Sequence, residues 1–180
     1  MAYNNPKTLS LIATGTANNS ATYLEFTSKI TTSFTTYYVE IRNLLPATNN
    51  VTMELTYSTN NGSSYLATNY GYAYHNTTSQ PASTSTGSNS AASAIFCSAL
   101  SNGASTGFSA DMYLYNVDTT TPMHFKGMGS HYNTSSYLNH VAFAGFNSGT
   151  TAVTAIKFTL SSGNMVSGTI RLYGVKEDGI

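Results

Sequence analysis

The sequence predicts an all-β protein, an antiparallel β-sandwich of the jelly-roll type, and three observations support this fold class. Apolar and polar residues alternate with a period of two along many short segments, which is typical of half-buried strands. Ser, Thr and Asn make up 70 of the 180 residues, a composition that favours strands and turns over helices. Short segments rich in Gly, Asn and Ser separate the alternating stretches. The length suits a single domain spanning residues 1–180.

Four strands are predicted in the first third of the chain, at residues 8–14, 22–28, 35–43 and 51–59. LPATNN, at residues 45–50, joins the last two of them. In the third strand, the apolar side of the alternation consists of Tyr37, Val39 and Ile41. Its polar side places Glu40 beside Arg42, which predicts charge pairing with a neighbouring strand.

The middle of the chain begins with a fifth predicted strand at residues 65–75 and then loses the alternation. NNGSS, at Asn60–Ser64, precedes this strand, and its Asn-Gly pair predicts a tight hairpin turn. Residues 79–106 open with a run of Ser and Thr, so we expect one long crossover loop there. Within it, residues 91–100 fit a short helix that is ended by Asn102-Gly103.

The last five strands are predicted at residues 108–116, 122–132, 137–147, 151–160 and 166–176. SSGN, at residues 161–164, predicts a hairpin that pairs the last two of these strands. In the closing strand, Ile170 and Leu172 should then face the core. Tyr173 and Val175 fall on the opposite face, which suggests cover by the N-terminal segment or another subunit. Ile170, Leu172, Tyr173 and Val175 are therefore the candidate interface.

Charge and cysteine content exclude several classes of protein. The net charge is zero and only 8% of residues are charged, so we expect no basic face for nucleic acid. No apolar run approaches the length of a membrane helix, and residues 1–17 lack the apolar core of a signal peptide. The lone cysteine, Cys97, lies between apolar residues and should be buried. No cofactor or metal motif is present, so we expect neither group.

Tyrosines are the most distinctive feature of the sequence. Tyr70, Tyr72 and Tyr74 share one face of a predicted strand, and Tyr113 and Tyr115 share a face of another. Such stripes can pack in the core, bury at a subunit interface or stack on sugar rings. A second candidate surface for glycans lies at His131, Tyr132 and Tyr137, although these residues also fit a solvated strand end. The acids show no spacing that argues for a glycosidase pair.

Three segments resemble small β-rich structural proteins of marine tailed bacteriophages. They are LSLIATGTANNSATYLEFTS, TTYYVEIRNLLPATNNVTMELTYSTNNGSSY and AVTAIKFTLSSGNMVSGTIRLYGVK, and SSGN followed by SGTIRLYG is the most specific part. Residues 76–106 match least well. The resemblance implies a virion structural component encoded near tail-fibre or other appendage genes, and it implies no catalytic residues.

Taken together, the residues and the resemblance lead us to expect a non-enzymatic virion protein, made in the host cytoplasm and exposed on the particle. It would be a tail-fibre or receptor-binding component that serves host attachment, or a capsid decoration protein. Its partners would be other virion proteins, further copies of itself, with a homotrimer favoured, and host surface glycans. The alternatives are a stand-alone, lectin-like carbohydrate-binding module and an enzyme such as a depolymerase.

Overall fold

The predicted antiparallel β-sandwich is confirmed. The structure, a computed structural model, describes residues 8–80, 82–117 and 121–176, which form twelve strands and no helix. The strands are β1 (Thr8–Thr16), β2 (Tyr23–Phe26), β3 (Thr36–Pro46), β4 (Val51–Ser58), β5 (Tyr70–Thr78), β6 (Ser83–Ala91), β7 (Ala94–Leu100), β8 (Phe108–Tyr115), β9 (His124–Tyr132), β10 (Leu138–Asn147), β11 (Ala155–Leu160) and β12 (Met165–Lys176).

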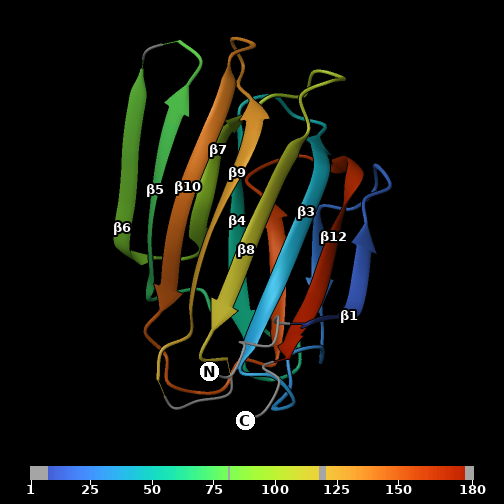
Figure 1. The fold of residues 1–180 in the computed structure, drawn as a ribbon, viewed down its shortest axis with the longest axis vertical. Coiled ribbons are helices and arrows are strands. Elements are labelled where there is room, and N and C mark those ends of the chain that lie inside the picture. Colours follow the sequence, from blue (N-terminus) through green and yellow to red (C-terminus); the bar gives the residue numbers. More distant parts are fainter. Residues whose placement is uncertain (1–7, 81, 118–120, 177–180) are drawn as a thin grey trace, which may run out of the picture.

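The strands form two antiparallel sheets of unequal size, which lie face to face (Figure 1). The larger sheet has eight strands in the order β1-β12-β3-β8-β9-β10-β5-β6. The smaller sheet has four strands in the order β2-β11-β4-β7. The jelly-roll arrangement is not confirmed by this pattern. Because the larger sheet is twice as wide, part of it extends past the smaller one.

The three turns that suggested hairpins connect strands of different sheets. The turn at Asn61 and Gly62 forms as expected, with φ angles of 60° and 87°, but it leads from β4 in one sheet to β5 in the other. LPATNN and SSGN likewise cross between the sheets. The predicted pairing of the last two strands is therefore wrong: β12 pairs with β1 and β3, and β11 pairs with β2 and β4.

The expected crossover loop and helix within residues 79–106 are also wrong. This segment contains β6, which extends the larger sheet at β5, and β7, which pairs with β4 at the edge of the smaller sheet. The Ala-rich stretch has moderate helix propensity, but pairing with β4 buries Ala94 and Phe96 completely. Tertiary burial of this kind routinely overrides local propensity.

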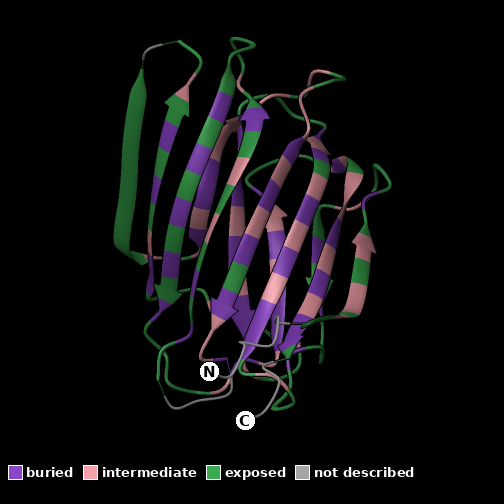
Figure 2. Ribbon diagram, viewed as in Figure 1, coloured by how far each residue is buried: buried purple, intermediate pink, exposed green. Residues whose placement is uncertain are grey.

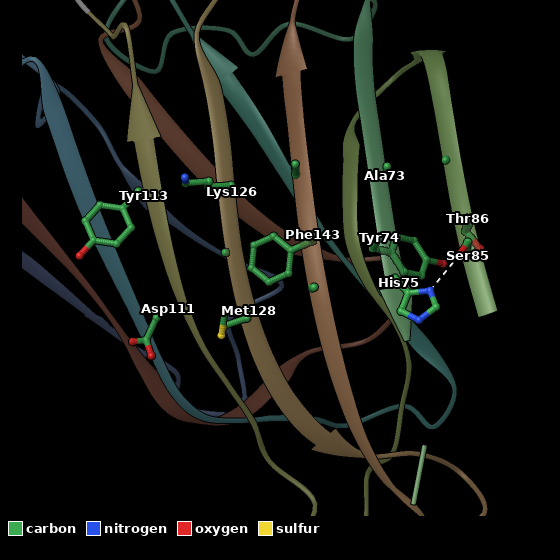
Figure 3. A pocket seen from close by; sticks show the side chains of 14 residues that line it. Ala73, Tyr74, His75, Ser85, Thr86, Asp111, Tyr113, Lys126, Met128 and Phe143 are labelled. Carbon is green, nitrogen blue, oxygen red and sulfur yellow. Dashed lines mark hydrogen bonds between the residues drawn. The ribbon is translucent and has the colours of Figure 1, made fainter. Parts of the chain in front are cut away.

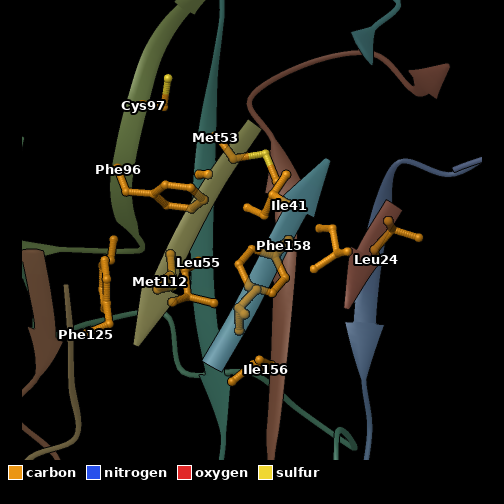
Figure 4. Packing of buried hydrophobic residues seen from close by; sticks show 14 of the residues in the cluster. Leu24, Ile41, Met53, Leu55, Phe96, Cys97, Met112, Phe125, Ile156 and Phe158 are labelled. Atoms are coloured by element: carbon orange, nitrogen blue, oxygen red, sulfur yellow. The ribbon is translucent and has the colours of Figure 1, made fainter. Parts of the chain in front are cut away.

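The core lies between the two sheets, and Phe96 is one of its buried residues (Figure 4). Its ring lies 5.1 to 6.4 Å, centroid to centroid, from four other rings, those of Phe108, Phe125, Phe143 and Phe158. Cys97 is buried as predicted, and this burial raises the pKa of its thiol. The sulfur is therefore a packing group rather than a reactive thiolate.

β6 is the most exposed of the twelve strands (Figure 2). Eight of its nine residues are exposed, because this strand lies at the end of the larger sheet and only β5 pairs with it. Its sequence, STSTGSNSA, carries no charge and no proline. The strand therefore presents an unpaired backbone edge without the charged residues or prolines that usually protect such edges.

Candidate functional site

The outer face of the eight-stranded sheet carries a row of three tyrosines. Strand register places Tyr173 opposite Tyr38, and Tyr38 opposite Tyr113. The rings of Tyr38 and Tyr173 are 5.7 Å apart, and those of Tyr38 and Tyr113 are 5.2 Å apart. All three point away from the core because each falls at a polar position of the two-residue alternation. We call Tyr38, Tyr113 and Tyr173 the tyrosine row.

A network of charged side chains runs beside the tyrosine row. Register places Arg171 opposite Glu40, and Glu40 opposite Asp111. Glu40 accepts bonds from Arg171 Nη1 at 2.7 Å and from Arg42 Nη2 at 2.8 Å. Arg42 also lies 3.3 Å from Asp111 Oδ1, and the Tyr38 hydroxyl donates to the same oxygen. The predicted pairing of Glu40 with a neighbouring strand is confirmed.

The network shifts the pKa of Glu40 and Tyr38, among other members. The hydrogen bond from Arg171, together with the nearby Arg42, lowers the pKa of Glu40. Burial and the hydrogen bond to Asp111 raise the pKa of Tyr38. At neutral pH the network therefore holds two guanidinium groups, two carboxylates and a neutral phenol, and its arginines and carboxylates balance.

Replacing Glu40 with glutamine should lower the free energy of unfolding by about 1 kcal/mol at pH 7, since two arginines lose their shared partner in a partly exposed site. The folded pKa of Glu40 lies below its unfolded value of about 4.3. Its stabilisation is therefore fully present above that unfolded value and is lost as the pH falls through the folded pKa. Urea midpoints of wild type and variant should differ at neutral pH and converge in acid.

A matched control is Glu54→Gln, because Glu54 accepts bonds from the hydroxyls of Thr52 and Ser93 rather than from a cation. We expect a smaller loss in that variant. Subtracting the free energy of unfolding of the variant from that of the wild type also cancels the pH dependence that His131 contributes, because burial lowers the pKa of His131 in both proteins. A difference for Glu40→Gln that stays constant down to about pH 2 would contradict the proposed network.

A hollow of about 990 Å³ lies beside the tyrosine row on the same face of the sheet (Figure 3). Its floor is formed by small outward-facing residues, Ala73, Ala142, Ala144 and Gly87, and by the backbone of their strands. Register explains the depression: Ala144 lies opposite Ala73, which lies opposite Gly87. Three neighbouring strands thus carry almost no side chain at the same level of the sheet.

The two sides of the hollow carry different groups. On one side, β8 and β9 present Asp111, Tyr113, Lys126 and Met128. Lys126 Nζ lies 5.7 Å from the centroid of the Tyr115 ring, over its face. On the other side, His75 Nδ1 and Ser85 Oγ form a hydrogen bond of 2.9 Å (Figure 3). The hollow therefore combines an apolar floor, an aromatic edge, a cation, a carboxylate that is paired with Arg42, and a polar pair.

The tyrosine stripe of β5 does not form a surface site, because most of it is buried. Tyr70 and Tyr74 face the core and are buried, and Tyr72, stacked on Tyr74 with 6.3 Å between the ring centroids, is half-buried. The core alternative is thus correct for Tyr70 and Tyr74, and a solvent-facing stripe is wrong. The cause is β7, which packs beneath β5 and replaces the expected loop.

The second predicted glycan surface is only partly at the surface. His131 is 1% exposed, donates from Nδ1 to the Tyr132 carbonyl at 3.1 Å, and packs edge-on against Phe108. Tyr132 and Tyr137 are exposed at the tip of the β9–β10 hairpin. The structure therefore separates His131 from the two tyrosines, because consecutive strand residues point to opposite faces.

The candidate interface on β12 is divided between two faces as well. Ile170 and Leu172 are fully buried in the core, as predicted. Val175 is also buried, at 3% exposure, so it offers no open surface to a second subunit. Tyr173 alone contributes to an outer face, as part of the tyrosine row. The phenyl ring of Phe34 fills the space above Gly174, where a Cβ would lie 2.5 Å from ring atoms.

Sequence reasoning missed the residues of the hollow. Tyr113 was noted as part of a stripe, but Lys126, Met128 and the three alanines were not singled out. A signal was present in VAFAGF, where Val141 and Phe143 alternate with Ala142 and Ala144. Small residues at every polar position of a strand indicate a depressed outer surface, provided that the neighbouring strand does the same.

Among residues 8–80, 82–117 and 121–176, no three His, Cys, Asp or Glu side chains are grouped so that they could hold a metal ion. The same residues contain no helix long and apolar enough to cross a membrane. No protein-family model matches the sequence, and no curated protein matches it either.

Proposed function

We propose that this protein is a non-enzymatic structural component of a bacteriophage particle, made in the host cytoplasm and exposed on the virion. It serves as a tail-fibre or receptor-binding component, or as a capsid decoration protein, and its outer face contacts a molecule outside the chain. The phage assignment is supported by the resemblance of three sequence segments. The binding role is supported by one structural observation, the hollow beside the tyrosine row.

The hollow supports binding because exposed aromatic and apolar side chains border a concave floor. Tyr113 and Met128, both exposed, border a floor of alanines on a rigid sheet. Exposed aromatic groups beside a concave apolar surface are typical of recognition sites. The backbone of the floor, in β10, β5 and β6, is fixed by the ladders of these strands with each other and with β9, so little conformational entropy would be lost on binding.

The carboxylates of the outer face support a non-enzymatic role. A glycosidase places two carboxyl groups on either side of the scissile bond, and one of them must carry a proton. Glu40 and Asp111 are instead direct cross-strand neighbours, and both bind Arg42. Because the pKa of Glu40 is lowered, it is a poor general acid. The arrangement stabilises the face rather than activating a bond.

The free edge of β6 supports the homo-oligomer, for which we favour a trimer. A nine-residue strand without charge or proline offers backbone donors and acceptors to a strand of another copy. This edge replaces β12 as the expected subunit contact, since Val175 is covered within the chain. Other virion proteins are further partners that this edge could engage.

A stand-alone, lectin-like carbohydrate-binding module is the second candidate function. The same hollow favours it, since a small ligand needs no particle. The two functions differ in where the chain is found and in its assembly state: a lectin module would be monomeric and free, whereas a virion protein would be oligomeric and incorporated.

The test is the presence of this chain in intact particles. Gradient-purified virions should contain it by mass spectrometry, and an antibody against the folded protein should label them without disruption. Tens of copies per particle would indicate an appendage, and hundreds would indicate decoration. If intact infectious particles lack the chain, or if it is present but inaccessible to the antibody, the proposed function is wrong.

A further inference from the structure

We propose that the hollow binds an anionic saccharide, one whose carboxylate or sulfate group lies against Lys126. This inference rests on the proposed function, because both place the contact with an external molecule on the outer face of the sheet. It deepens that function by naming the class of ligand. The inference depends on three features of the hollow: an uncompensated cation, a surface suited to a sugar ring, and hydrogen-bonding groups on opposite sides.

Lys126 supplies the charge complementarity. Arg42 pairs with Glu40 and Asp111, and Arg171 pairs with Glu40, but no carboxylate of a described residue lies within ion-pair distance of Lys126. Its ammonium group lies over the Tyr115 ring, which holds it near the hollow. A cation without a partner, in a protein with only seven Lys and Arg, gives an anionic ligand a local advantage.

The floor and the aromatic edge suit a pyranose ring. A sugar has a face of C–H groups, which packs on aromatic and aliphatic carbon, and a rim of hydroxyls. Tyr113 and Met128 provide exposed carbon surface at the edge, and the alanines leave room for the ring beside them. A volume of about 990 Å³ exceeds the needs of one monosaccharide and suits a short oligosaccharide.

Polar groups on two sides of the hollow can reach the hydroxyl rim. Asp111 binds Tyr38 and Arg42 through Oδ1, and no described residue donates to its Oδ2, so this oxygen can accept from a sugar hydroxyl. The His75–Ser85 pair on the other side can both donate and accept. Bonds from both sides would orient the saccharide across the alanine floor.

The geometry disfavours an extended peptide as the ligand. A peptide that adds to a sheet binds at a free edge, where backbone groups are unpaired. The floor of the hollow is instead formed by the faces of β10, β5 and β6. β10 and β5 are interior strands whose ladders are complete on both sides, and the unpaired edge of β6 lies on its side away from β5 and the hollow. Recognition must therefore come from side chains and from shape, as it does for a saccharide.

The test is a titration of the purified full-length chain, by calorimetry and by NMR, with three matched ligands: 3′-sialyllactose, lactose 3′-sulfate and lactose. We expect the two acidic sugars to bind at least tenfold more tightly than lactose, and their affinity to fall as NaCl rises. Lys126→Gln should weaken acidic sugars about tenfold or more and leave lactose unchanged. Ala144→Leu should weaken all three by filling the floor.

Lys29→Gln is the control, because Lys29 is exposed and outside the hollow. It should leave every affinity unchanged. The inference is overturned if lactose binds as tightly as the acidic sugars, if Lys126→Gln and Lys29→Gln behave alike, or if no acidic sugar binds folded protein. A chain that binds acidic sugars but is absent from particles would refute the virion assignment alone. If the chain is exposed on particles but does not bind acidic sugars, this inference alone is refuted.

Discussion

Replacing Phe96 with alanine is expected to lower the free energy of unfolding by about 3–5 kcal/mol. Phe96 is fully buried, and its ring packs against aromatic residues of both sheets: Phe108, Phe125 and Phe143 in the larger sheet and Phe158 in the smaller. Truncation removes apolar area from the core and leaves a cavity, since four large rings cannot collapse into the space. A loss of this size is a large part of the total stability of a typical domain.

Urea unfolding followed by tyrosine fluorescence measures the loss, and Phe146→Ala is the matched control. Phe146 is 38% exposed on the outer face of β10, so its truncation should cost much less. Phe96→Leu keeps most of the volume and should fall between the two variants, which preserves a measurement if the alanine variant fails to fold. Equal losses at positions 96 and 146 would contradict the packing of the two sheets around Phe96.

The sequence predicts much of this core because alternation fixes which residues point inward. The inward set of β3, which consists of Tyr37, Val39 and Ile41, is the expected one, and its members are completely buried. All ten predicted strands form. β10 shows the limit of the method: Val141 and Phe143 fix its parity, which exposes Leu138 and Phe146 and buries Asn139 and Asn147. Hydropathy alone would have predicted that Leu138 and Phe146 are buried and that Asn139 and Asn147 are exposed.

The pairing of strands could not be predicted, because turn chemistry reports a change of direction and not the sheet that the next strand joins. Asn61-Gly62 adopts the expected left-handed backbone, yet its strands do not pair. Similarly, the helix expected at residues 91–100 rested on local composition and on the terminating Asn102-Gly103, signals that carry no information about β4. The segment that contains Phe96 becomes a strand because it pairs with β4, and the local sequence does not show that pairing.

The hollow lay beyond sequence reasoning for the same reason. Ala73 and Ala144 are more than seventy residues apart and become neighbours only when β5 pairs with β10. By contrast, the charge network was partly visible, since Glu40 and Arg42 share a face within one strand. The contributions of Asp111 and Arg171 depend on the neighbouring strands, β8 and β12.

Replacing Gly168 with alanine should lower the free energy of unfolding by about 2–4 kcal/mol, through two causes that add. Gly168 has a φ of 113°, a backbone conformation that residues with a Cβ rarely adopt. A Cβ there would lie 2.6 Å from Leu44 Cα and 2.7 Å from Asn43 O, and backbone atoms of a central strand cannot move aside cheaply. The register of β12 against β3 shifts at this residue, so the strain falls on the ladder that joins them.

Gly15→Ala provides the comparison, because Gly15 pairs with Ile170 only two residues away from the site of strain. A Cβ at Gly15 would meet Leu24 and Phe26 at 3.5 Å, which is ordinary contact, and its φ is not positive. We expect the stability of that variant to change by less than about 1 kcal/mol in either direction. Thermal and urea unfolding of the two alanine variants should therefore differ clearly. If both unfold at the wild-type midpoint, the close approach of β12 to β3 at Leu44 does not exist in solution, and the register shift at Gly168 must lie elsewhere in the strand.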